Sequence, residues 1–136
     1  MSSEIRSGRH VVFNLHAHLV FVTKYRRRVF DRAILEDMKA IFENIGKEYD
    51  VEFKEFNGEE DHVHMLIHYP PKVSIVKLVN SLKGVSSRRL RQKWPQLEKR
   101  YYKGVLWSPS YFAGSCGGAP IDILKKYIRH QNEPKS

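Results

Sequence analysis

Alternating apolar and polar positions first appear between Val11 and Thr23, where the sequence reads VVFNLHAHLVFVT. One parity holds mostly large apolar side chains, which is typical of a strand that packs one side on a core. From Leu19 onward both parities are apolar, as in a central strand covered on both faces. We therefore expect a strand over residues 11–23, preceded by a loose polar arm over residues 1–10. The apolar parity comprises Phe13, Leu15, Ala17, Leu19 and Phe21.

Two later segments repeat apolar residues every three or four positions, which is the spacing of an amphipathic helix. The first spans residues 31–49 and starts at Asp31, a residue type that caps helix N-termini. The second starts at Ser74 and continues to about Lys93, because Pro95 disfavours helix in the residue before it. The apolar stripes are Leu35, Met38, Phe42, Ile45 and Tyr49 in the first helix, and Ile75, Val79, Leu82 and Val85 in the second.

Shorter patterns complete the order of elements. Apolar runs rich in β-branched and aromatic residues predict strands, and Gly, Pro and Asn mark the turns between them. The further elements are a strand at 51–56, a turn at 57–60, a strand at 61–69, a charged connection at 95–104, a strand at 111–115 and a final helix within 119–131.

The order strand, helix, strand, strand, helix, strand matches the split βαβ plan of ferredoxin-like and RRM-like domains. We therefore expect one α+β domain over residues 1–136, with an antiparallel βαββαβ sheet and an additional C-terminal helix. Helices cover one face of such a sheet and leave the other open. The final helix, which follows the flexible pair Gly117-Gly118, is expected to lie across the open face.

Composition narrows the class of partner. The net charge of +9 and the pI near 9.7 favour an anionic partner, with nucleic acid ahead of a membrane surface. No apolar run approaches the roughly 20 residues of a membrane span, and the N-terminus lacks the apolar core of a signal peptide. Cys116 is the only cysteine, which excludes an internal disulfide and a cysteine-rich zinc site. We expect a cytoplasmic protein.

Histidines supply the first candidate chemistry. His62 and His64 are two residues apart in an apolar run, so on a strand both imidazoles point to one face. Two imidazoles placed in this way can hold a divalent metal, although two hydrogen-bonded or surface histidines are the alternative. His16 and His18 occupy the polar parity of the first strand, where they either approach that site or serve the structure.

Cations supply the second candidate chemistry. A cluster directly after the first strand surrounds Tyr25 and is suited to holding phosphates and stacking on a base, although a solvated turn is the alternative. Another set on the second long helix mixes cations with small hydroxyls, which lets a phosphate backbone approach closely. The candidate DNA-contacting residues are Lys24, Arg26, Arg27, Arg28, Lys83, Ser86, Ser87, Arg88 and Arg91.

Several spaced motifs, taken together, resemble a known family. They are His18-Leu-Val-Phe-Val-Thr-Lys-Tyr-Arg-Arg27, Asp61-His-Val-His64, Lys83-Gly-Val-Ser-Ser-Arg88, Leu106-Trp-Ser-Pro-Ser-Tyr111 and Lys126-Tyr-Ile-Arg-His-Gln131. In this order they resemble the single-tyrosine HUH transposases, the small TnpA-like enzymes of the simplest bacterial and archaeal insertion sequences. The resemblance covers residues 11–131.

This resemblance implies a metal site of His62, His64 and Gln131 that holds Mg²⁺ or Mn²⁺, with Tyr127 as the catalytic nucleophile. It implies a transposase that cuts and rejoins single-stranded DNA at element ends through a 5′-phosphotyrosine intermediate. Imperfect hairpins near those ends are the implied recognition elements. The implied assembly is a homodimer with shared active sites.

Two other functions stay open at this point. One is a non-catalytic RRM-like nucleic-acid-binding module, but such domains usually stack bases on aromatic residues of the central strands, where this chain has His62 and His64. The other is a host-domesticated HUH nuclease that acts on repeated palindromes. A covalent DNA–protein adduct would separate the binding module from both enzymes.

Overall fold

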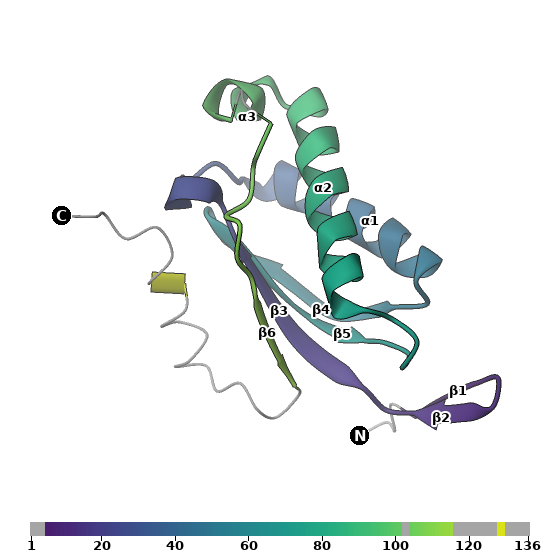
Figure 1. Ribbon diagram of the computed structural model, residues 1–136. Helices are drawn as coiled ribbons and strands as arrows, with labels where there is room; N and C mark the ends of the chain where they lie inside the picture. Colours follow the sequence, from purple (N-terminus) through teal and green to yellow (C-terminus); the bar gives the residue numbers. More distant parts are fainter. Residues whose placement is uncertain (1–4, 102–103, 116–127, 130–136) are drawn as a thin grey trace.

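The computed structural model describes residues 5–101, 104–115 and 128–129. Within these ranges the chain forms a four-stranded antiparallel sheet with long helices on one face and a small hairpin at one end (Figure 1). The strand order is β4-β5-β3-β6. The strands are β3 at His16–Val22, β4 at Glu52–Gly58, β5 at His62–His68 and β6 at Phe112–Ser115. This order and the helices between the strands confirm the α+β, ferredoxin-like fold class.

Both long helices begin at the residues that the sequence predicts. Helix α1 spans Arg32–Glu48, and the carboxylate of its N-cap Asp31 accepts a hydrogen bond from the backbone N–H of Ile34 at 2.9 Å. Helix α2 spans Ile75–Lys93 and is capped in the same way by Ser74. It ends at Lys93 because the next residue, Trp94, precedes a proline and adopts an extended conformation.

The hydrophobic core lies between these two helices and one face of the sheet. Side chains from β3 and β5 that point to this face are 6% exposed or less. Leu15 was predicted to belong to this row, but it is 36% exposed and outside the core. The core residues of the two strands are Ala17, Leu19, Phe21, Val63, Met65 and Ile67.

The predicted strand over residues 11–23 is divided in two. Strand β2, Val11–Phe13, leaves the main sheet and pairs with β1, Arg6–Gly8. The division follows from the partner strand, because β5 ends at His68 before Pro70 and Pro71, which cannot donate backbone hydrogen bonds. Just beyond β5 the N–H of Tyr69 still donates to the carbonyl of Leu15, and the residues before Leu15 have no partner strand in the main sheet. The prediction of a loose arm over residues 1–10 was wrong for residues 6–8.

Two connections also differ from expectation. Asn57-Gly58 was predicted to be part of a turn, but these two residues are the end of β4. The turn lies at Glu59–Asp61, where the N–H of Glu59 donates a hydrogen bond to the carbonyl of His62. Gly58 is a glycine in a strand because an added Cβ would lie 2.5 Å from Leu35 Cδ2.

The charged connection at 95–104 contains the short helix α3, Pro95–Arg100, and a 3₁₀ turn η1 spans Lys24–Arg26. None of the helices in the described ranges is long and apolar enough to cross a membrane. Residues 128 and 129 are helical, and the remainder of the final helix predicted within 119–131 lies outside the described residues.

Candidate functional site

His62 and His64 lie on the face of the sheet opposite the hydrophobic core. Their antiparallel partners on β3 are Val22 and Val20, which point to the same face. Both imidazoles are half-buried, and their ring centroids are 6.2 Å apart with an interplanar angle of 25°. The period of two in the sequence therefore places both rings side by side, as predicted.

Asp61 orients the first of these histidines. Its Oδ1 lies 2.9 Å from Nδ1 of His62, so the Nδ1–H of a neutral imidazole donates to the carboxylate. That tautomer leaves Nε2 with its lone pair free to bind a metal. A carboxylate behind a ligating histidine is a common arrangement in metal sites, because it fixes the ring and raises its basicity.

Arg26 holds the same carboxylate from its other side. Its Nε donates to Asp61 Oδ2 at 3.2 Å, and the Asp61 side chain is largely buried. Burial alone would raise the pKa of the Asp61 carboxyl, but hydrogen bonds from His62 and Arg26 outweigh it and lower this pKa. Asp61 therefore stays ionised at neutral pH, where it can hold the imidazole of His62.

The same arginine also contacts the C-terminal part of the chain. Arg26 Nη1 donates to the backbone carbonyl of Arg129 at 3.3 Å. One guanidinium thus links the carbonyl of Arg129 to Asp61, and through Asp61 to His62. Tyr127 and Gln131, the predicted nucleophile and third ligand, lie outside the described residues.

His64 is suited to metal binding because it resists protonation. Burial lowers the pKa of His64 below its ordinary value of 6.5, and the neighbouring His62 lowers it further. Within residues 5–101, 104–115 and 128–129, no three His, Cys, Asp or Glu side chains are grouped to hold a metal. Two neighbouring imidazoles are nevertheless suitable donors for a divalent metal.

His16 and His68, further along the same face, pack against each other at the other end of the sheet. His16 is paired with His68 across β3 and β5, and their rings stack with centroids 4.3 Å apart. Phe13 packs edge-on against His68 at 5.7 Å. His18 lies opposite Leu66, two positions along β3 from His16. Of the two readings left open for His16, the stacked geometry supports the structural one.

Residues 24–28 divide into different environments. The side chains of Lys24 and Arg27 lie over the ring of Tyr25, at 5.3 and 5.2 Å from its centroid. Tyr25 itself is 59% exposed, so its ring is accessible to a partner. Arg27 also donates to the carbonyl of Arg100, and Arg28 is exposed beside Glu60. Arg26 differs from these residues because it faces inward to Asp61.

The predicted DNA-contacting residues of α2 also divide into buried and exposed groups. Ser86 is fully buried, and its hydroxyl accepts a hydrogen bond from the indole N–H of Trp107. Ser87 is buried as well and accepts from the backbone N–H of Leu106. Both hydroxyls therefore hold the segment before β6 against α2 instead of facing solvent.

The cations of α2 show the same division. Lys83 Nζ donates to the carbonyls of Ser108 and Ser110 at 2.7 and 2.8 Å, and burial lowers its pKa to about 8. Arg91 is tied to Ser87 and Glu98. Arg88 is exposed, which makes it the exposed member of the three cations predicted on this helix to contact phosphates.

Comparison with known proteins identifies the family. The model of the family described as "Transposase IS200 like" matches residues 11–131, nearly the whole chain. The chain belongs to the IS200-like transposase family. This assignment agrees with the motifs and confirms a DNA-processing transposase.

Individual relatives give the same result. The transposase is 32% identical to the ISDra2 transposase TnpA of Deinococcus radiodurans over 96% of this chain and 93% of that protein. It is 31% identical to the transposase for insertion sequence element IS200 of Salmonella typhimurium, over 94% of this chain and 84% of the relative.

Solved structures match as well. A crystal structure of a candidate transposase from Deinococcus radiodurans superposes with a TM-score of 0.85 at 31% identity, covering 93% of this chain and 97% of the other. A REP-associated tyrosine transposase bound to a REP hairpin gives a TM-score of 0.55 at 10% identity. The match covers 96% of this chain and 70% of the other. The second likeness concerns the fold alone.

The sequence did not reveal the roles of two residues in this transposase. Asp61 was noted only as a neighbour of the histidines, and Arg26 was predicted to contact DNA. Their link depends on the turn that places η1 beside β5, where the N–H of Thr23 donates to the carbonyl of Asp61 at 2.9 Å. A carboxylate directly before a His-x-His pair was the one available signal for Asp61.

Proposed function

We propose that this transposase cuts and rejoins single-stranded DNA, with Tyr127 as nucleophile and with Mg²⁺ or Mn²⁺ held by His62, His64 and Gln131. The observation that supports it most is the pair of neighbouring imidazoles on one sheet face, with Asp61 and Arg26 behind His62. Such ordered support is expected for a metal ligand and is unnecessary for a solvated histidine.

In the proposed cleavage step, the phenolic oxygen of Tyr127 attacks the phosphorus of one phosphodiester. A bond forms between that oxygen and the 5′ phosphate, and the bond to the 3′ oxygen of the preceding nucleotide breaks. The phenolic proton is lost and the leaving oxygen gains a proton, so the products are a 5′-phosphotyrosine and a free 3′ hydroxyl.

Rejoining is the reverse reaction with a different 3′ hydroxyl. The phosphotyrosine retains the free energy of the phosphodiester, so no external energy source is needed. A bound divalent cation would supply electrostatic stabilisation of the phosphoryl oxygens. The task of the protein residues is to orient the two histidines, to position Tyr127 and to bind the strand.

The DNA substrate is proposed to be a strand with imperfect hairpins at the element ends. The net charge of +9 supports an interaction with phosphates. One structural neighbour is a tyrosine transposase bound to a REP hairpin, which makes a hairpin a reasonable first substrate to test. Tyr25, Arg28 and Arg88 are exposed and are candidates for such contacts.

The direct test of this proposal is a search for the covalent intermediate. Labelled single strands from the DNA flanking the gene are incubated with the protein, with and without Mg²⁺, and separated under denaturing conditions. We expect an adduct in wild type that requires Mg²⁺ and is absent in Tyr127→Phe, which retains hairpin binding. Tight binding without any adduct in wild type would favour the non-catalytic module instead.

We further propose that the active sites are shared in a homodimer, with Tyr127 of one protomer beside His62 and His64 of the other. The contact between Arg26 and Arg129 is formed within one chain, and in a shared dimer the equivalent carbonyl would come from the partner. Mixing Tyr127→Phe with His64→Ala protein tests this arrangement. A shared dimer regains one intact site and cleaves again, whereas proven subunit exchange without recovery would contradict sharing.

A further inference from the structure

A cavity of about 290 Å³ lies between α2 and the segment that leads to β6. Trp107 and Tyr111 contribute to its walls from that segment, and Lys83 and Gly84 contribute from α2. Gly84 is exposed, and in the described part of the chain a Cβ added there would meet no atom within 4 Å beyond adjacent residues and its own helix backbone. The cavity is therefore open to solvent on the Gly84 side, next to Lys83.

The amine of Lys83 is fixed at one wall of this cavity. Its Nζ donates to the carbonyls of Ser108 and Ser110 at 2.7 and 2.8 Å. The ring centroids of Phe21 and Tyr111 are 5.5 and 5.6 Å from the same nitrogen. Within the described residues, no carboxylate offsets the charge of Lys83. The nitrogen thus lies between two carbonyls and two rings without a compensating negative charge.

These surroundings favour the neutral amine over the ammonium. Burial lowers the pKa of Lys83 from its ordinary value of 10.5 to about 8. A neutral amine has two N–H groups and one lone pair, so both carbonyls keep their hydrogen bonds when Lys83 loses its third proton. The lone pair is then available to an electrophile that enters the cavity.

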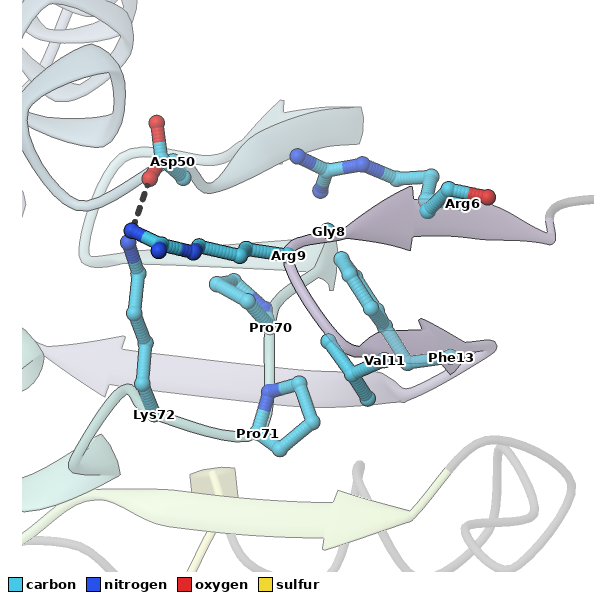
Figure 2. Close-up of a pocket in the computed structure, with 10 residues that line it drawn as sticks. Arg6, Gly8, Arg9, Val11, Phe13, Asp50, Pro70, Pro71 and Lys72 are labelled. Atoms are coloured by element: carbon cyan, nitrogen blue, oxygen red, sulfur yellow. Dashed lines mark ion pairs between the residues drawn. The ribbon is translucent and has the colours of Figure 1, made fainter.

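Lys72 provides a contrast within the same protein. It lines a different cavity, at the β1–β2 hairpin, where it pairs with Asp50 at 2.8 Å (Figure 2). The Lys72 side chain is 71% exposed, so water and a carboxylate both stabilise its charged form. Lys77 is exposed on the same helix as Lys83 and does not line the cavity beside it. A difference in reactivity among these three lysines therefore reports on the surroundings of Lys83.

We propose that Lys83 is an acylation site, modified by a small acyl phosphate that enters this cavity. A small anionic donor suits a cavity of this size in a chain with a net charge of +9. The Lys83 nitrogen attacks the carbonyl carbon of the donor, a C–N bond forms and the bond from that carbon to the phosphate oxygen breaks. The surplus proton of the nitrogen passes to the leaving phosphate. This proposal does not depend on the cleavage chemistry proposed above.

Acylation should loosen the segment before β6. The product is a neutral amide with a single N–H, so it can donate to only one of the carbonyls of Ser108 and Ser110. The positive charge that strengthened both hydrogen bonds is also lost. Modification of Lys83 would therefore weaken the attachment of this segment to α2.

The test compares the acetylation rates of individual lysines in the wild-type protein. The protein is incubated with acetyl phosphate at about pH 8, near the lowered pKa of Lys83, and mass spectrometry of peptides gives the initial rates at Lys83, Lys72 and Lys77. The same reaction in guanidinium chloride gives the rates in the unfolded chain. We expect Lys83 to react about tenfold faster than either control lysine in the folded protein, and within about twofold of them after unfolding. A folded-state rate at Lys83 no higher than that of the controls would overturn the proposal, as would an advantage that persists after unfolding.

The consequence of acylation has its own measurement. Acetyllysine is incorporated at position 83 or, as the matched control, at position 77, and both proteins are melted beside wild type. We expect acetylation of Lys83 to lower the Tm by about 5 °C and acetylation of Lys77 to leave it within about 1 °C. Equal melting temperatures would contradict the loss of a hydrogen bond to Ser108 or Ser110.

Discussion

The two faces of the central sheet perform different tasks with residues that alternate along the same strands. On one face, β3 and β5 present only apolar side chains to α1 and α2. On the other, the same strands present His16, His18, His62, His64 and His68, together with Val20, Val22 and Leu66. Because side chains alternate with a period of two, a strand can specify the fold with one parity and a site with the other. The two tasks should therefore be separable by mutation.

The largest expected effect on stability comes from the core face. Phe21 is fully buried and packs against Phe42 and Trp107, with ring centroids 5.9 and 5.6 Å away. Phe21→Ala should lower the free energy of unfolding by about 3–5 kcal/mol, because it leaves a cavity that the core cannot fill. His18→Ala, on the opposite face of the same strand, should lower the free energy of unfolding by less than about 1 kcal/mol. Denaturant unfolding of both variants provides the measurement, and similar losses would contradict the separation of tasks.

A smaller effect distinguishes a structural cation from a DNA-contacting one on α2. Lys83→Met removes two hydrogen bonds from a charged donor to backbone carbonyls and should cost about 1.5–3 kcal/mol of stability. The salt dependence of DNA binding should not change. Arg88→Met should leave the free energy of unfolding within about 0.5 kcal/mol of the wild-type value. It should reduce the slope of log DNA affinity against log salt concentration by about 1. A reduced slope in Lys83→Met would restore Lys83 as a phosphate contact.

Arg26 provides a test on the histidine face. Arg26→Gln leaves Asp61 without its ion pair and should weaken Mn²⁺ binding about tenfold, as is typical when the support of a metal ligand is lost. Arg28→Gln is the matched control, since Arg28 is exposed and only loosely paired with Glu60 at 3.9 Å. Isothermal calorimetry measures both affinities. If the two variants bind Mn²⁺ equally, Arg26 does not position His62.

The smallest expected effect is a shift in the titration of His64. Burial, followed by the proximity of His62, lowers the pKa of His64, so its NMR titration in the metal-free protein should have a midpoint below 6.5. The unfolded chain binds this proton more readily, so His64 should decrease stability as pH falls below 6.5 through the folded pKa. In His62→Gln the midpoint should rise only partly, because burial remains. A midpoint above 6.5 in wild type would contradict this account.

Sequence patterns predicted the elements whose signals are local. Residues close in sequence determine the helix caps at Asp31 and Ser74 and the two faces of β5. The structure confirms all three predictions. The β1–β2 hairpin was missed because the end of β3 depends on where its partner β5 stops. Nothing within residues 11–15 carries that information.

The site was predictable to a similar degree. The His62–His64 pair follows from strand geometry, whereas the link from Asp61 to Arg26 is a tertiary contact. Ser86 was misjudged by composition, although it lies four residues from both Leu82 and Leu90 and therefore shares their buried stripe. Tyr127 and Gln131 remain predictions that rest on the family resemblance.

One measurement tests the central claim, that the histidine face of the sheet is a metal site, most directly. Mn²⁺ is titrated by calorimetry into metal-free wild type, His64→Ala and His16→Ala. Both substitutions remove one imidazole from the same face, but His16 stacks on His68 at the far end. We predict that His64→Ala loses most of the Mn²⁺ affinity while His16→Ala binds like wild type. Unchanged binding in His64→Ala would contradict the account.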